Sequence, residues 1–227
     1  MNIIDDSWSW VVNTSANVTW PSKKLLTDAE KDEIAKYLSS GYYIILTGEN
    51  GRLSSLAVQF MSYVLTGRWS NYSHCLMNCD FISDPSQRNQ FKFVQATTVG
   101  VGYATFDDIF NNSDYVCLLT PKLIDNDQWS GVIDALVKEN GTPYDDLFDL
   151  ADSTKVSCVE CVLNAFKSLP DFDKDFGRLE RMIKHKENLV PSMYRACPDF
   201  KIAYETGEHK FEPKWKGTFH KGHGKRR

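Results

Sequence analysis

Four short apolar segments between residues 42 and 121 decide which fold class this chain can adopt. They are YYIILTG (42–48), SHCLMNCDF (73–81), FKFVQATTV (91–99) and YVCLLTP (115–121), and each is typical of a largely buried strand. A further short strand is predicted at KIAYE (201–205), and helical patterns occupy residues 25–41, 52–67, 127–141 and 156–169. Because strands cluster mid-chain with helices on either side, the pattern predicts an α+β fold with a mostly antiparallel sheet.

The chain divides into three parts. Residues 1–22 contain three of the six tryptophans, so we expect this N-terminal arm to pack onto the body. Residues 23–212 form the main domain, in which DPSQRNQ (84–90) is predicted to be a polar loop and 171–190 an exposed helical excursion. Residues 213–227 form a basic tail, interpreted as a solvated end that is able to contact anionic surfaces.

Charge and hydropathy exclude several classes of function. The net charge of −4 gives no reason to expect specific nucleic-acid binding, and no segment approaches the roughly 20 apolar residues of a membrane span. Asp5 and Asp6 stand where a secretory signal would be basic, so we expect no signal peptide and synthesis in the cytoplasm. The six cysteines are expected to be unpaired there, and no cofactor is expected.

The segment VSCVECVLNAF (156–166) contains two cysteines at the start of a predicted helix. Ser157 and Glu160 fit a capping box, which makes Cys158 the first helical residue. The unpaired amides at a helix N-terminus stabilise a thiolate, which is the reactive form of cysteine. Cys161 lies almost one turn deeper on an apolar run. Cys158 is therefore placed to react and Cys161 to pack.

A reactive thiol needs a base and a group that orients the base. Of the five histidines, only His74 begins a strand-like apolar stretch that could cross a core. Gln95, on the next predicted strand, carries an amide oxygen that could accept from the imidazole. From spacing alone, a structural histidine and a water-facing glutamine remain alternative interpretations.

Two other uses of the cysteines must be weighed. Cys75, Cys79, Cys158 and Cys161 together could hold zinc. Strand alternation, however, puts Cys75 and Cys79 on the face opposite His74, so we expect a site that joins His74 to Cys158 to turn both cysteines away. A redox role for Cys158 and Cys161 is disfavoured because no thioredoxin-like βαβ pattern surrounds them.

Five motifs in order resemble a known family. YYIILTG, Ser73-His74, VQATTVGV, GTPYDD (141–146) and Cys158-Val159-Glu160-Cys161 are similar to the motif series of circularly permuted NlpC-type papain-like enzymes, the YaeF/YiiX-like branch. The segment LVPSMYRACPDF (189–200) resembles the closing segment of that branch. The resemblance covers about residues 40–205, and the branch occurs in bacteria and viruses. If the chain is viral, the resemblance leaves host-cell or virion association open.

The resemblance implies a permuted papain-like fold and a cysteine peptidase or amidase. Cys158 would be the nucleophile, His74 the general base and Gln95 the orienting residue, with Tyr144 and Ser73 at the substrate. The implied substrate is a peptide or amide bond, such as those of a cell wall, or an acyl ester. Val159 and Gln95 depart from the usual Ser and Glu. These departures leave a catalytically silent binding or structural module as an alternative. Because the branch includes amidases and acyltransferases, an acyl-lipid hydrolase or acyltransferase of the same fold is the other.

Overall fold

The structure is a computed structural model that describes residues 24–49, 53–66, 70–145, 154–184 and 190–207. The predicted packing of the N-terminal arm (1–22) and the predicted role of the basic tail (213–227) lie outside these ranges. No helix within the described ranges has both the length and the apolar character needed to cross a membrane.

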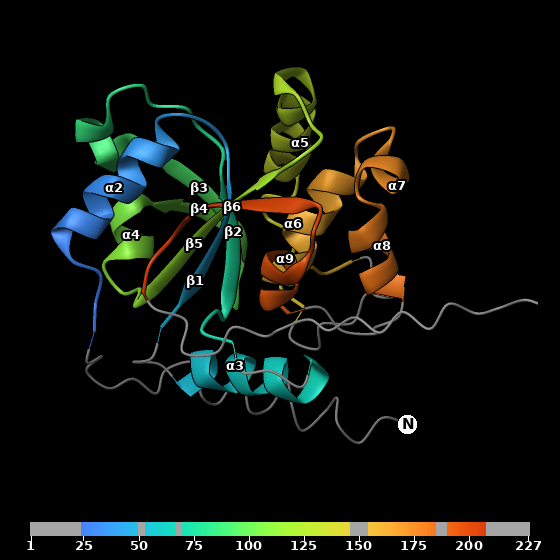
Figure 1. Cartoon of the computed structure of the whole chain (residues 1–227), viewed down its shortest axis with the longest axis horizontal. Helices are drawn as coiled ribbons and strands as arrows, with labels where there is room; N and C mark the ends of the chain where they lie inside the picture. The colour runs from blue at the N-terminus through green and yellow to red at the C-terminus, as the bar shows by residue number, and fades with distance from the viewer. Residues whose placement is uncertain (1–23, 50–52, 67–69, 146–153, 185–189, 208–227) are drawn as a thin grey trace, which may run out of the picture.

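A six-stranded sheet forms the centre of the protein, as Figure 1 shows. The strands, in chain order, are β1 (Ile44–Gly48), β2 (His74–Asn78), β3 (Lys92–Thr97), β4 (Gly100–Thr105), β5 (Tyr115–Pro121) and β6 (Phe200–Glu205). Their spatial order is β4-β3-β2-β1-β5-β6, and every neighbouring pair is antiparallel. The predicted α+β class with an antiparallel sheet is therefore confirmed.

Helices cover both faces of this sheet. Helices α2 (Asp28–Leu38) and α4 (Phe106–Phe110) lie on one face, over a core that includes Leu76 and Phe93. The opposite face carries α5 (Asn126–Lys138), α6 (Cys158–Lys167), α7 (Phe172–Asp175), α8 (Gly177–Lys184) and α9 (Ser192–Ala196). Helix α3 (Leu53–Thr66) lies across one end of the sheet. Strands β1 to β5 supply alternate residues to the two cores.

Local sequence signals placed several of these elements correctly. The capping box of Thr27 and Glu30 is present at the start of α2, and that of Ser157 and Glu160 at the start of α6. The predicted loop at 84–90 is wrong: Pro85–Gln90 forms a 3-10 helix, because Asp84 accepts a hydrogen bond from the Ser86 amide and caps its start. The hairpin strand β4 and the short helix α4 were not predicted.

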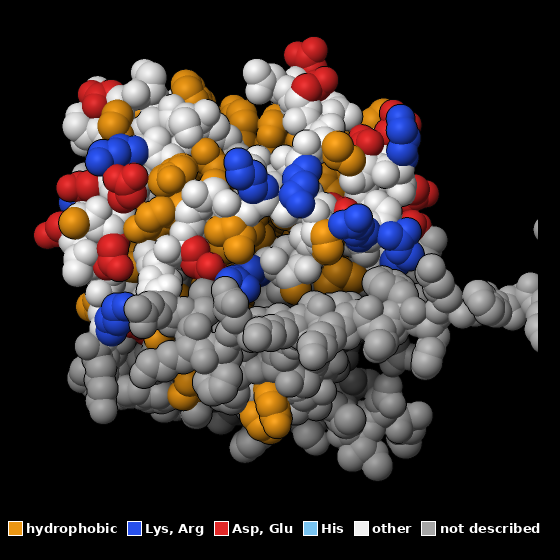
Figure 2. Space-filling view, in the orientation of Figure 1, with side chains coloured by type: hydrophobic (Ala, Val, Ile, Leu, Met, Phe, Trp, Pro, Cys, Tyr) orange, Lys and Arg blue, Asp and Glu red, His pale blue; other side chains and the backbone are white. Residues whose placement is uncertain are grey.

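The charged stretch after α6 is not simply exposed, so the prediction of an exposed excursion at 171–190 is wrong for its inner face. Phe172, Phe176 and Leu179 are buried in the core beside α6. Figure 2 shows Lys and Arg side chains over α8, where Arg178 and Arg181 are exposed. Charges cover only the outer side of this segment, which is why its composition hid the buried side.

At the end of β1, two backbone segments approach closely. A Cβ added to Gly48 would lie 1.7 Å from the carbonyl oxygen of Asn71 and 2.9 Å from its carbonyl carbon. Asn71 lies three residues before His74, which pairs with Thr47 of β1. Glycine at position 48 therefore lets the segment that leads into β2 pass against β1.

Candidate functional site

Helix α6 places Cys158 at its first position. The Ser157 hydroxyl accepts from the Glu160 amide at 3.3 Å, and the Glu160 carboxylate accepts from the Ser157 amide at 2.8 Å. Ser157 and Glu160 are both buried, so water does not compete for this cap. The reciprocal bonds fix where the helix begins and leave the amides of its first turn facing the Cys158 side chain.

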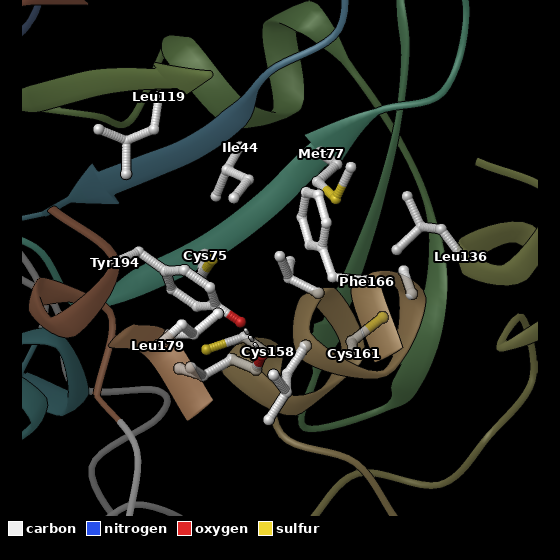
Figure 3. Close-up of a cluster of buried hydrophobic side chains, with 14 of the residues drawn as sticks. Ile44, Cys75, Met77, Leu119, Leu136, Cys158, Cys161, Phe166, Leu179 and Tyr194 are labelled. Carbon is white, nitrogen blue, oxygen red and sulfur yellow. Dashed lines mark hydrogen bonds between the residues drawn. The ribbon is translucent and has the colours of Figure 1, made fainter. Parts of the chain in front are cut away.

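The Cys158 thiol is buried and its pKa is raised. Only 2% of the residue is exposed, and burial raises the pKa of the thiol to about 12. The charge of Glu160 also raises this pKa, whereas the backbone N–H groups of Cys75, Val159 and Cys158 lower it. In Figure 3, Cys158 lies beside Tyr194 and Cys75. The thiol is therefore neutral at rest, but it is surrounded by amides that would stabilise negative charge.

Cys75, which lies close to this thiol, stands at the end of the pairing between β2 and β3. Strands β2 and β3 pair from Asn78↔Phe93 to Leu76↔Gln95, and Cys75 is the next residue beyond that last pair. Cys75 and Cys158 lie in the same buried cluster, so the thiol lies close to the residue that follows His74 in the chain.

His74 and Gln95 are in direct contact. The Nε2 atom of His74 lies 2.7 Å from Oε1 of Gln95. An amide oxygen only accepts hydrogen bonds, so Nε2 carries the proton and Nδ1 of the neutral ring is able to accept one. The structure thus brings His74 and Gln95 together and brings Cys158 to the residue beside His74. Proton transfer between Cys158 and His74 stays a prediction.

The expected orientation of Cys75 is wrong. Strand alternation holds, but α6 packs on the face of β2 that carries Cys75, so Cys75 lies in the same cluster as Cys158 and Cys161. Burial, followed by the charge of Cys158, raises the pKa of Cys75. Cys79 is partly exposed. Within the described ranges, no group of three or more His, Cys, Asp or Glu side chains is arranged to hold a metal ion.

Ser73 and Tyr144 are each held to neighbouring elements by backbone contacts. The Ser73 amide donates to the Thr47 carbonyl at 2.9 Å, and its hydroxyl is hydrogen-bonded to that of Ser55 in α3. Tyr144 forms a short parallel bridge with Val156, two residues before Cys158. Both residues are thus held close to the elements that carry His74 and Cys158. Their contact with a substrate stays a prediction.

Sequence reasoning missed Tyr194 as a site residue. Its Oη donates to the carbonyl oxygen of Val159 at 2.9 Å, and the ring is buried against the first turn of α6. Burial, followed by the charges of Cys75 and Cys158, raises the pKa of Tyr194, and all three residues belong to one buried cluster. The segment 189–200 resembles a family motif, but nothing in it marks this tyrosine as a partner of α6, because the contact joins residues 35 positions apart.

Glu160→Gln is expected to lower the pKa of the Cys158 thiol. Glutamine still completes a capping box but removes the negative charge that raises this pKa. The rate of Cys158 alkylation at pH 7.5, followed by mass spectrometry, should rise. Glu30→Gln, the same change in the capping box of α2, should leave this rate unchanged. An unchanged rate in Glu160→Gln would show that this carboxylate does not act on the thiol.

Comparison of the chain with protein-family models, with curated proteins and with solved structures found no match.

Proposed function

We propose that this protein is a cysteine hydrolase of the amidase or peptidase type, with a permuted papain-like arrangement. His74 takes the proton of the Cys158 thiol, and the thiolate attacks the carbonyl carbon of an amide or peptide bond. The Cys158 N–H stabilises the oxyanion, and His74 returns the proton to the leaving amine. Water, deprotonated by His74, then hydrolyses the thioester and restores the thiol.

One observation carries this proposal. The imidazole of His74 is held by Gln95 at 2.7 Å, and the next amide along β2, that of Cys75, acts on the Cys158 thiol at the start of α6. A thiol at a helix N-terminus, packed against the strand neighbour of a histidine that an amide holds, supports the roles of nucleophile, base and orienting group. Because alternation puts the His74 side chain on the other face of β2, the proposed proton transfer requires the imidazole to reach the thiol around the start of that strand.

A catalytically silent binding module is the second candidate function. The 2% exposure of Cys158 and a thiol pKa of about 12 favour it. In that case Cys158, His74 and Gln95 would be packing residues of the fold that catalyse no reaction.

The pH dependence of Cys158 alkylation by iodoacetamide separates the two functions. If His74 takes the proton, the rate should level off above the ordinary pKa of imidazole, about 6.5, and stay nearly flat to about pH 8.5, below the pH at which the fold is expected to be lost. His74→Ala should then lower the rate at pH 7.5 about a hundredfold, the lower end of the range for general-base catalysis. Gln95→Ala should lower it less, because the base remains but its ring is no longer held. Fragment ions in mass spectrometry assign the label to Cys158 or Cys161.

Gln87→Ala, a change in the 3-10 helix away from these residues, is the control and should keep the wild-type rate. A thiol that ionises alone with a pKa of about 12 would instead react about ten times faster per pH unit from pH 7 to about 8.5. That profile, unchanged by His74→Ala, would refute the hydrolase and support the silent module.

A further inference from the structure

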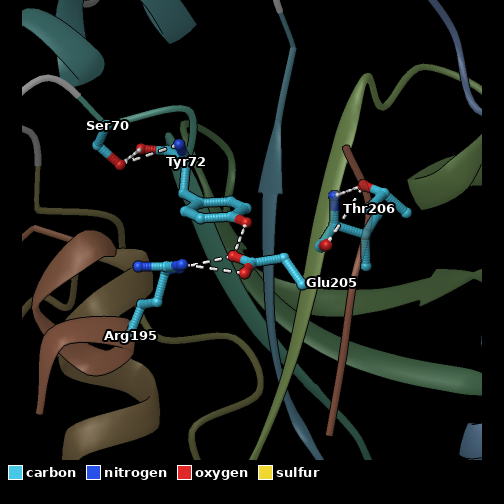
Figure 4. Close-up of polar contacts among 6 residues, drawn as sticks. Ser70, Tyr72, Arg195, Glu205 and Thr206 are labelled. Atoms are coloured by element: carbon cyan, nitrogen blue, oxygen red, sulfur yellow. Dashed lines mark hydrogen bonds and ion pairs between the residues drawn. The ribbon is translucent and has the colours of Figure 1, made fainter. Parts of the chain in front are cut away.

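A carboxylate on the last strand joins three segments of the chain. Glu205 accepts from the Tyr72 hydroxyl at 2.5 Å and from Arg195 at 2.6 Å through Nε and 3.0 Å through a terminal guanidinium nitrogen, as Figure 4 shows. Only 22% of the Arg195 side chain and 15% of the Glu205 side chain are exposed. A bidentate, charge-assisted pair in so little water is stronger and more rigid than a surface ion pair.

One end of this network leads to His74. Tyr72 is fully buried, and its amide donates to the Ser70 hydroxyl at 3.0 Å, so both its ring and its backbone are held. The chain continues through Ser73, whose amide is bonded to β1, directly to His74. Fixing the Tyr72 hydroxyl therefore fixes the start of the strand that carries the proposed base.

The other end leads to Cys158. Arg195 lies in α9 next to Tyr194, and the Tyr194 hydroxyl donates to the carbonyl oxygen of Val159 in the first turn of α6. Figure 3 shows the Tyr194 ring reaching from α9 to this turn, beside Cys158. Fixing Arg195 therefore fixes the tyrosine that holds the start of α6.

We propose that Glu205 is a positioning residue that ties the strand carrying His74 to the helix carrying Cys158. It touches no reacting atom. It acts through Tyr72 on one side and through Arg195 and Tyr194 on the other. Its role in catalysis rests on the proposed function. The tie itself, meaning the hydrogen-bonded connection from Tyr72 through Glu205 to α9 and on to α6, does not depend on that function.

Glu205→Gln tests the tie because it keeps the side-chain volume but removes the charge that holds Arg195. Amide hydrogen exchange should accelerate about tenfold at both 72–75 and 157–161, since both segments lose a shared anchor. Cys158 alkylation at pH 7.5 should fall about tenfold, because small misplacements of catalytic groups are costly. Glu33→Gln, the same change in an exposed pair with Lys36, should alter neither measurement.

Tyr194→Phe removes a single hydroxyl and tests the helix end separately, even if Glu205→Gln does not fold. It should accelerate exchange at 157–161, leave 72–75 unchanged and lower the alkylation rate. In Tyr194→Phe, unchanged amide exchange at residues 157–161 would overturn the tie. In Glu205→Gln, faster exchange confined to residues near 195 and 205 would also overturn it, as would a wild-type alkylation rate. If His74→Ala alkylates Cys158 at the wild-type rate, the proposed hydrolase function fails. The amide-exchange pattern of the two variants still decides whether the tie exists.

Discussion

Raising the pH from 8 to 10 is expected to remove about 10 kcal/mol of folding stability, enough to unfold the protein. Five cysteines are buried with raised pKa values: Cys75, Cys117, Cys158, Cys161 and Cys197. Burial is the largest cause in each case. In the unfolded chain these thiols ionise near pH 8.5. Between that pH and their folded pKa values, the unfolded state has lost protons that the folded state keeps, so stability falls as pH rises.

The size of this effect follows from the number of thiols. Each costs about 1.4 kcal/mol per pH unit above 8.5, or about 2 kcal/mol at pH 10. Five such thiols together match the whole stability of an ordinary domain, about 5–15 kcal/mol. Thermal unfolding in a phosphine reductant at pH 8, 9 and 10 measures it. Cys117→Ala should make the pH dependence shallower by one thiol's share. Equal melting temperatures at pH 8 and 10 would contradict the prediction.

Gly48→Ala is expected to destabilise the fold by about 3 kcal/mol or more, the upper end of the range for overpacking. The added methyl group would lie 1.7 Å from the carbonyl oxygen of Asn71. That oxygen belongs to the backbone, so no rotation of a side chain relieves the clash. Strand β1 and the segment that leads to His74 must separate, and Cys158 alkylation should slow together with the loss of stability. Denaturant unfolding of the two chains measures the energetic part.

Gly131→Ala is the matched control for this substitution. Gly131 lies in α5 with open space around its Cα, and alanine there should stabilise the helix by about 1 kcal/mol. The two alanine variants should therefore change stability in opposite directions. Similar unfolding midpoints for both would show that the close approach at Gly48 does not constrain the fold.

Much of the local structure was predictable from sequence because its causes are local. Thr27 with Glu30, and Ser157 with Glu160, cap helices through side chains three residues apart. The apolar segment around Ile44 became a fully buried strand. By contrast, β4 has the sequence GVGYAT, whose two glycines weaken the strand pattern, and it forms by pairing with β3.

The parts of the site that could not be predicted depend on packing between distant segments. Neighbouring strands made the contact of His74 with Gln95 predictable. Which face of β2 is covered by α6 was not predictable from the sequence. For that reason Cys75 was expected to point away from Cys158, whereas it lies beside it. Tyr194 and Glu205 carry no local signal at all. Their partners, Val159 and Tyr72, lie 35 and 133 residues away along the chain.

The strand order has a consequence for how the protein folds. Strands β1, β2, β3 and β4 are neighbours both in sequence and in space, so the pair His74–Gln95 closes a loop of only 21 residues. Helix α6 follows in sequence only after β5 and α5, and its docking closes a much longer loop. Short loops close sooner and at lower entropic cost. The contact of His74 with Gln95 is therefore expected to form early in folding, and Cys158 to reach its place last.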